Sequence, residues 1–115
     1  MRLAPRALRP NIMFLAKVEG SVVATKKDAS MGGRKLLLVR PQLVDEKDPA
    51  KFRPGTNTIV AVDSVGAGIG ELVMFCQGSS ARLAPNLKEV PVDAVIIGIV
   101  DTVDVLGKQI YNAKQ

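Results

Sequence analysis

The sequence contains no histidine and no tryptophan, and it has only one tyrosine and three phenylalanines. Without histidine the chain lacks the usual general base, the commonest metal ligand and any Ser-His or Cys-His nucleophile pair. An enzyme built from this sequence would have to rely on carboxylates, lysines or a bound cofactor. We therefore predict a protein that is not an enzyme and that has no cofactor and no metal site.

The chain is also poor in cysteine and in long hydrophobic runs. The single cysteine, Cys76, lies within an apolar run at residues 72–76 and has no partner for an intrachain disulfide, which suits a reducing compartment. No apolar run approaches the roughly 18 residues of a membrane span, and the basic N-terminus lacks the apolar core of a signal peptide. These features predict a cytoplasmic protein that does not contact a membrane.

An excess of one charge is present but unevenly placed. The chain has 16 Lys and Arg against 11 Asp and Glu, a balance that favours nucleic acid or an acidic partner. Arg2, Arg6 and Arg9 all lie in the first twelve residues, so from Met13 onward 13 basic residues face 11 acidic ones. The charge of the main part of the chain is therefore a weak argument for nucleic acid.

Residues 13–25 (MFLAKVEGSVVAT) alternate as a β-strand with one buried side does. Gly20, in the middle of this segment, predicts a bend or a bulge. The residues expected on the buried face are Phe14, Ala16, Val18, Gly20, Val22 and Ala24, with Lys17, Glu19, Ser21 and Thr25 on the other face.

Four further segments are strand candidates: 35–41, 58–65, 71–77 and 94–105. A turn around Gly32-Gly33 should pair the first two strands as a hairpin, whereas 42–57 reads as a long polar loop and 78–93 as a connection with a short helical turn. With 115 residues there is room for one domain and none for crossover helices. We predict an all-β fold, a small closed five-stranded barrel of the oligonucleotide/oligosaccharide-binding (OB) type.

The strand candidates are apolar on both faces, which is unusual for a barrel on its own. Unbroken apolar runs occupy 36–39, 59–62, 72–76 and, apart from Gly98, 94–100. Their outward side chains must be covered, because each large apolar side chain left in water forfeits about 1.5–3 kcal/mol. Since the chain has little left to cover them, we expect neighbouring subunits to do so, in a homo-oligomer.

Three glycines, Gly66, Gly68 and Gly70, follow a β-branched run as a phosphate-binding loop would. Their G-x-G-x-G spacing leads into a strand-like segment, whereas a dinucleotide fingerprint needs G-x-G-x-x-G followed by a helix. The glycines therefore predict a tight structural loop or a close subunit approach, with a small-anion or pore-lining role as the alternative.

The second polar motif is GSSAR at residues 78–82, comprising Gly78, Ser79, Ser80 and Arg82. Neither serine has an activating base, so a nucleophilic role is not expected. The motif predicts a turn in which Arg82 pairs with a carboxylate or carbonyl, either within the chain or across a subunit boundary.

The acidic residues do not form a catalytic or metal-binding set. Asp101 and Asp104, three apart on an expected strand, should face opposite sides. Asp45, Glu46 and Asp48 lack the spacing of a calcium loop and read as solvated loop charge.

A basic group near the first hairpin leaves nucleic-acid binding as the second hypothesis for an OB-type barrel. Single-strand binders stack bases on exposed aromatic rings, and two of the four rings here, Phe14 and Phe75, belong to the core pattern. Only Phe52 and Tyr111 remain for stacking, so the sequence does not favour nucleic acid as a partner. The basic residues concerned are Lys26, Lys27, Arg34 and Lys35.

Five ordered segments together resemble the EutN/CcmL family of bacterial microcompartment vertex proteins. They are MFLAKVEGSVVAT (13–25), KLLLVRP (35–41), AVDSVGAGIGELV (61–73), GSSAR (78–82) and VPVDAVIIGIVD (90–101). The resemblance implies a five-stranded barrel, a homopentameric ring and a structural role at the corners of a protein shell, next to hexameric shell proteins. It also implies that GSSAR and the loop around Gly66, Gly68 and Gly70 lie near subunit contacts or the ring axis.

The resemblance divides the chain into a barrel at residues 13–105, an N-terminal extension at 1–12 and a C-terminal tail at 106–115. The extension either precedes a true start at Met13 or is a basic arm that contacts shell partners or cargo. The tail is less diagnostic, and Ile110 and Tyr111 could pack on a neighbouring subunit.

Overall fold

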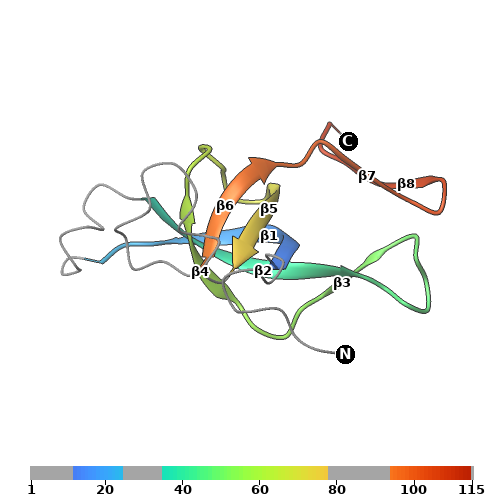
Figure 1. Cartoon of the computed structure of the whole chain (residues 1–115), viewed down its shortest axis with the longest axis horizontal. Coiled ribbons are helices and arrows are strands. Elements are labelled where there is room, and N and C mark those ends of the chain that lie inside the picture. Colours follow the sequence, from blue (N-terminus) through green and yellow to red (C-terminus); the bar gives the residue numbers. More distant parts are fainter. Residues whose placement is uncertain (1–11, 25–34, 78–93, 115) are drawn as a thin grey trace, which may run out of the picture.

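The structure is a computed structural model that describes residues 12–24, 35–77 and 94–114. All regular elements of this part are β-strands (Figure 1). They are β1 (Ile12–Val22), β2 (Lys35–Val44), β3 (Phe52–Pro54), β4 (Ile59–Asp63), β5 (Leu72–Gln77), β6 (Ala94–Ile99), β7 (Thr102–Val105) and β8 (Lys108–Asn112).

Five of these strands close into a barrel in the order β1-β5-β6-β4-β2, because β2 pairs back onto β1. β4 and β6 are parallel, and the other neighbouring pairs of the barrel are antiparallel. The predicted all-β barrel and the predicted pairing of the first two strands are confirmed. The helical turn expected within 78–93 and the Gly32-Gly33 turn lie outside the described residues.

The strands are staggered, as closure of a small barrel requires. Followed from strand to strand, the residue pairs that start at Met13 in β1 return to β1 at Val22. This offset tilts the strands against the barrel axis, as closure of a sheet into a barrel requires.

A β-bulge interrupts β1, where Gly20 predicted a bend. The register against β2 shifts between Val18 and Gly20. The extra residue moves the following side chains to the opposite face, so that Ser21, not Val22, lies opposite buried Leu37. The prediction that the even-numbered residues share one face therefore holds to Val18 and is wrong beyond it.

The barrel interior is filled by branched aliphatic side chains around one aromatic pair. Phe75 is fully buried and stacks on Phe14, with ring centroids 5.4 Å apart. The core cluster consists of Ala16, Val18, Leu37, Val39, Ala61, Ala67, Val73, Phe75, Ala94 and Ile96.

The polar segment 42–57, predicted to be a loop, is instead part of a projecting hairpin. β2 continues to Val44 and pairs with β3 through Val44–Phe52 and Gln42–Pro54. We call residues 41–55 the β2–β3 arm. Arg40 anchors its base, since Nε donates to both carboxylate oxygens of Glu19 at 3.1 Å and Nη1 donates to the Gly55 carbonyl at 2.9 Å.

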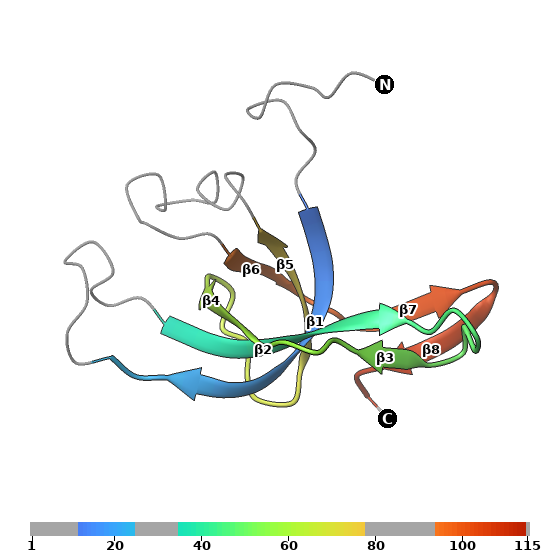
Figure 2. The ribbon, with the colours of Figure 1, turned by 90° about the horizontal axis from the view of Figure 1, so that it is seen from below.

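The predicted strand 94–105 is wrong as a single element. β6 ends at Ile99, and β7 pairs only with β8 in a separate two-stranded sheet. The chain leaves the barrel after the Val100 amide has donated to the Leu72 carbonyl at 2.9 Å. We call residues 102–112 the C-terminal hairpin, and both it and the β2–β3 arm project from the same end of the molecule (Figure 2).

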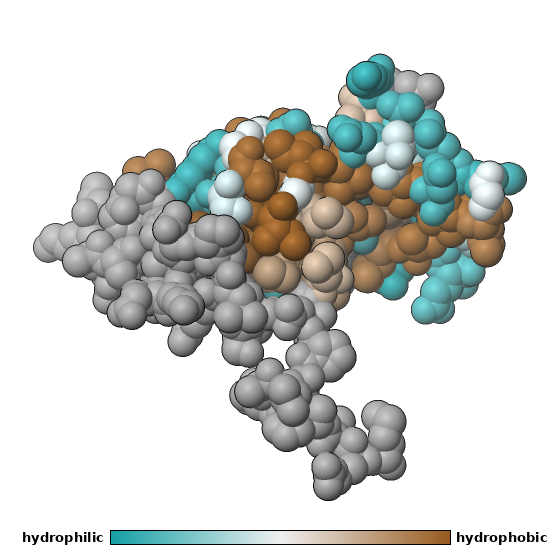
Figure 3. Space-filling view, turned by 45° about the horizontal axis from the view of Figure 1, so that its top comes forward, coloured by the Kyte–Doolittle hydropathy of each residue, from teal (hydrophilic) through white to brown (hydrophobic). Residues whose placement is uncertain are grey.

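The outer wall of the barrel carries apolar side chains, as predicted. Val62, Val95 and Cys76 form an outward row across β4, β6 and β5 and are already buried in the single chain. The prediction that neighbouring subunits must cover the outward apolar side chains is therefore wrong for this row. Met13 and Val60 stay about half exposed, and hydrophobic residues gather over β5 and β6 (Figure 3). In the described ranges no helix has the length and hydrophobicity to span a bilayer.

Candidate assembly site

The glycine loop at residues 64–71 joins β4 to β5, and two of its glycines are required by backbone conformation. Gly66 and Gly70 have φ values of 83° and 90°, in a region that residues other than glycine rarely adopt. Gly68 has no such φ, but a Cβ there would lie 3.4 Å from Glu71 Oε1. Backbone conformation therefore explains Gly66 and Gly70, whereas a Cβ at Gly68 would make only an ordinary contact.

The backbone amides of this loop are held by Asp63, the last residue of β4. Asp63 Oδ1 accepts hydrogen bonds from the amides of Val65 and Gly66 at 3.0 and 3.1 Å, and Oδ2 accepts one from Ala67 at 2.9 Å. The Asp63 side chain is 1% exposed. Hydrogen bonds from amides to a carboxylate are charge-assisted, so this residue fixes the first half of the loop.

Glu71 and β1 hold the second half of the loop. The Gly68 amide donates to Glu71 Oε1, and the Gly70 amide donates to the Val18 carbonyl at 2.8 Å. The Val18 amide in turn donates to the Glu71 carbonyl at 3.0 Å. Hydrogen bonds thus attach the loop to β1 of the barrel wall and fix its second half.

Lys35 closes the loop from β2. Its Nζ donates to the Ala67 carbonyl at 2.8 Å and lies 3.5 Å from Asp63 Oδ2. Lys35, which we had considered as a phosphate contact, is therefore engaged within the chain.

This geometry argues against one reading of the glycine loop, the binding of a small anion. The amides of residues 65–68 point at the carboxylates of Asp63 and Glu71, so they are not free to cradle a phosphate or another anion. The loop instead presents Ile69, which is 70% exposed, on a rigid support. An exposed isoleucine on a fixed loop is suited to contact another protein surface.

The described residues do not bear on the GSSAR motif. Gly78, Ser79, Ser80 and Arg82 lie outside the described residues, so their role stays a prediction.

The acidic residues that the sequence analysis weighed for a catalytic or metal site behave as surface groups. Asp101 and Asp104 are both exposed, and within residues 12–24, 35–77 and 94–114 no three His, Cys, Asp or Glu side chains are grouped to hold a metal ion. Asp45 Oδ1 accepts the Lys47 amide at 2.8 Å, and Asp48 Oδ1 accepts the Ala50 amide at 3.1 Å, so both build the turn of the β2–β3 arm. The hydrogen bond from Lys47 lowers the pKa of Asp45, with further help from the Asp48 amide.

The aromatic rings do not form an exposed stacking platform in the described part of the chain. Phe14 and Phe75 pack together, and Phe52 and Tyr111 are half-buried. Lys26, Lys27 and Arg34, the other basic residues considered for phosphates, lie outside the described residues.

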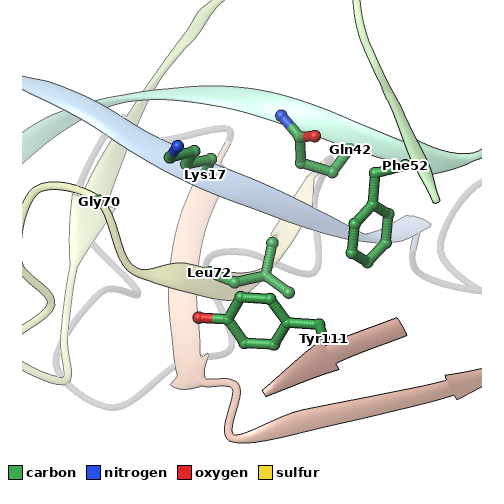
Figure 4. Close-up of a pocket in the computed structure, with 6 residues that line it drawn as sticks. All are labelled: Lys17, Gln42, Phe52, Gly70, Leu72 and Tyr111. Carbon is green, nitrogen blue, oxygen red and sulfur yellow. The ribbon is translucent and has the colours of Figure 1, made fainter. Parts of the chain in front are cut away.

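Phe52 and Tyr111 face a hollow of about 220 Å³ between the β2–β3 arm and the C-terminal hairpin (Figure 4). Leu72, from β5, forms its floor, and Lys17 and Gln42 lie at the rim opposite Tyr111. The hollow is concave and mostly apolar, with a few polar groups, as protein sites that receive another group usually are.

Sequence reasoning missed the two acidic residues that hold the glycine loop. Asp63 and Glu71 flank the loop directly, and a carboxylate next to successive glycine amides is the signal that could have identified them. It also missed the hollow, because Lys17, Phe52 and Tyr111 are brought together only by the barrel and its two hairpins.

Comparison with known proteins adds the family. Residues 13–101 match the model of the family described as "Ethanolamine utilisation protein EutN/carboxysome". The chain belongs to the EutN/CcmL family. The bacterial microcompartment shell vertex protein PduN of Salmonella typhimurium is 50% identical over 90 residues, which covers 78% of this chain and 97% of PduN.

Two solved structures support the family from the fold. The CcmL of Gloeobacter violaceus superposes with a TM-score of 0.76 at 43% identity, covering 89% of this chain and 99% of that one. The GrpN pentameric microcompartment shell protein from Rhodospirillum rubrum gives a TM-score of 0.65 at 44% identity, with 81% and 98% covered. The predicted resemblance is confirmed.

Proposed function

We propose that this chain is a structural, non-enzymatic shell vertex protein of a bacterial microcompartment and that it acts as a homopentamer. The observation that carries the proposal is the likeness, over most of both chains, to a microcompartment shell protein that is itself pentameric. A layer of hexagonal tiles stays flat, and five-fold units must replace some tiles before the layer can close.

The outer wall of the barrel supports assembly on physical grounds. Leu15 and Met74 lie opposite each other on the outward face of β1 and β5, and Met13 lies on the same face. Met13 and Met74 are exposed in the single chain. A ring places a different surface of the next copy against each such wall, because ring contacts are head-to-tail.

We further propose that the glycine loop and the GSSAR segment lie at subunit contacts or near the ring axis. The support for the loop is its rigidity and the exposed Ile69 that it presents. For Gly78, Ser79, Ser80 and Arg82 the support is the family resemblance of the segment. The proposed partners beyond the ring are hexameric shell proteins, which a vertex unit must touch on all five sides.

Native mass spectrometry of the purified chain tests the pentamer directly. We expect a mass of five copies, and a monomer over the same concentration range would contradict the proposal. A second test mixes the chain with a hexameric shell protein. Closed particles should form only when both components are present, whereas hexamers alone should give open sheets or tubes.

If the chain is a pentameric shell protein, we expect no salt-sensitive binding of single-stranded nucleic acid. A monomer with salt-sensitive affinity for single strands would instead favour the nucleic-acid hypothesis. Titration of labelled single-stranded DNA at two salt concentrations distinguishes the two.

A further inference from the structure

Leu106 lies at the tip of the C-terminal hairpin, where two unfavourable features coincide. Its φ of 51° is in the left-handed region, and its side chain is 85% exposed. With Gly107 at φ 80°, it forms a two-residue turn in which both central residues have positive φ. Such turns strongly prefer Asn, Asp or Gly at the first position, so a leucine there is costly in backbone and in solvation.

Among the described residues neither cost is offset. Leu106 lines a hollow of about 160 Å³ between the tips of the two hairpins, opposite Pro49 and Ala50, but its side chain stays largely exposed there. An exposed apolar side chain on a strained support suggests a contact that the single chain does not make.

The hairpin itself also needs support. It forms a two-stranded sheet apart from the barrel, and an isolated hairpin of this kind is marginally stable in water. Val103 and Tyr111 lie opposite each other on its half-buried face, whereas Asp104 and Gln109 lie opposite each other on its exposed face. The hairpin is therefore amphipathic, and its apolar face and tip are suited to lie against another protein.

The hollow at the base of the hairpin has the size and lining to receive a leucine side chain. It measures about 220 Å³ and is bounded by Phe52, Leu72 and Tyr111. Cavities of roughly 150 Å³ hold a benzene-sized group. Lys17 and Gln42 lie at its rim (Figure 4), where they can donate hydrogen bonds to the carbonyl groups of an inserted turn.

Leu106 cannot fill the hollow of its own chain. Tyr111 pairs with Val103 near the base of the hairpin, three residues before the tip. At about 3.3 Å per residue, roughly 10 Å of extended strand separates the Leu106 side chain, which we call the knob, from the hollow. The occupant must come from elsewhere.

We propose that Leu106 of one copy inserts into the hollow between the β2–β3 arm and the C-terminal hairpin of the next copy. The inference rests on the proposed pentamer, in which each copy has two neighbours. Each copy gives one knob and receives one, so the contact is head-to-tail and continues around a closed ring. The family model ends at residue 101, before the hairpin, so this contact uses residues beyond the part that the model matches.

The decisive variant is Leu106→Asn, because it should keep or raise the stability of the hairpin and lower the stability of the pentamer. Asparagine tolerates positive φ, so the turn should keep or gain stability, whereas the apolar knob is lost. We expect the concentration at which pentamers dissociate to rise at least about tenfold, measured by mass photometry over a dilution series. Leu106→Met, which restores an apolar side chain, should assemble like the parent chain.

Asp104→Asn is the matched control, since it makes a polar change on the exposed face of the same hairpin. It should leave the dissociation concentration unchanged. If Leu106→Asn also leaves it unchanged, the inference is overturned.

A double-mutant cycle tests the assigned hollow. Phe52→Ala enlarges the hollow and should weaken the pentamer, and Leu106→Asn should then cost much less than it does in the parent background. Fully additive effects would show that the two residues do not meet and would overturn the assignment. Amide signals of the β2–β3 arm, recorded by NMR, show whether Phe52→Ala leaves the arm folded.

The outcomes separate this inference from the proposed function. If the parent chain does not form pentamers, the proposed function fails. If the parent forms pentamers and Leu106→Asn does so equally well but loses binding to a hexameric shell protein, the knob serves a shell tile. In that case the inference is wrong while the vertex role stands.

Discussion

A single carboxylate, that of Asp63, fixes the first half of the glycine loop. Asp63 accepts hydrogen bonds from three consecutive amides and is almost fully buried, with Lys35 beside it. This arrangement resembles an anion site in which the protein supplies its own anion. The feature that suggested a nucleotide site in the sequence is thus satisfied internally.

We predict that Asp63→Ala lowers the free energy of unfolding by about 2–3 kcal/mol, because the buried Ala67 amide loses its acceptor. Asp63→Asn, which keeps one acceptor oxygen, should lose less. Urea unfolding at fixed protein concentration measures both. Asp104→Ala, an exposed acidic residue without this role, should change the value by less than about 0.5 kcal/mol, and an equal loss would contradict the assignment.

The three glycines should not be equivalent. Gly66→Ala and Gly70→Ala place a side chain at positive φ with open space around it, so each should cost about 1–2 kcal/mol through the backbone alone. Gly68→Ala meets only the edge of an ordinary contact with Glu71 and should cost less than either. Thermal unfolding of the three variants gives the order, and a Gly68 effect larger than the other two would contradict it.

At the scale of elements, the two hairpins that leave the barrel are the main departure from what the sequence predicts. The barrel strands could be predicted because their β-branched runs are long and their turns carry glycine. The bulge at Gly20 followed from a glycine inside a strand pattern. These signals are local, so a single sequence is enough to read them.

The hairpins could not be predicted for equally physical reasons. β3 is three residues long and ends in proline, so it is defined only by its pairing with β2. β6 and β7 are separated at Val100 and Asp101 without a glycine or proline to mark the break. The turn at Leu106 lacks the Asn-Gly signal of a two-residue hairpin, so the sequence does not predict it. Leu106, on which the further inference rests, is the residue that replaces this signal.

The turn of the β2–β3 arm should respond to acid. Amide hydrogen bonds from Lys47 and Asp48 favour the ionised form of Asp45 and lower its pKa relative to the unfolded chain. The contribution of Asp45 is therefore present at neutral pH and is lost as the pH falls through its folded-state value. The carboxyl ¹³C shift of Asp45, titrated by NMR, should have its midpoint below about 3.9, the usual value for aspartate.

The same titration contains its own check. A midpoint at or above the usual value would show that the turn is open in solution. Asp45→Ala should broaden or shift the Lys47 amide signal already at neutral pH.

At the scale of the whole molecule, assembly links the described barrel to segments outside it. We predict that Arg82→Ala weakens the pentamer while leaving the barrel folded, because Arg82 is expected to pair across a subunit boundary. Mass photometry at low concentration and far-UV circular dichroism measure the two properties. An unchanged pentamer at low concentration would contradict the role of Arg82.

Deletion of residues 1–12 is the companion experiment. The family match begins at residue 13, so the truncated chain should still form the same ring. Collapse to monomers would show that the segment belongs to the interface.

Barrel closure limits how copies of this chain can polymerise through their strands. Each barrel strand has a paired neighbour on both sides, so in the described part the strands that lack a neighbour on one side are β3 and the two strands of the β7–β8 sheet, which are three to five residues long. Short edges offer poor templates for runaway strand-to-strand polymerisation. A component that is crowded beside many copies of itself can therefore associate through side chains alone, and such contacts permit a fixed number of copies where exposed strand edges would permit fibrils.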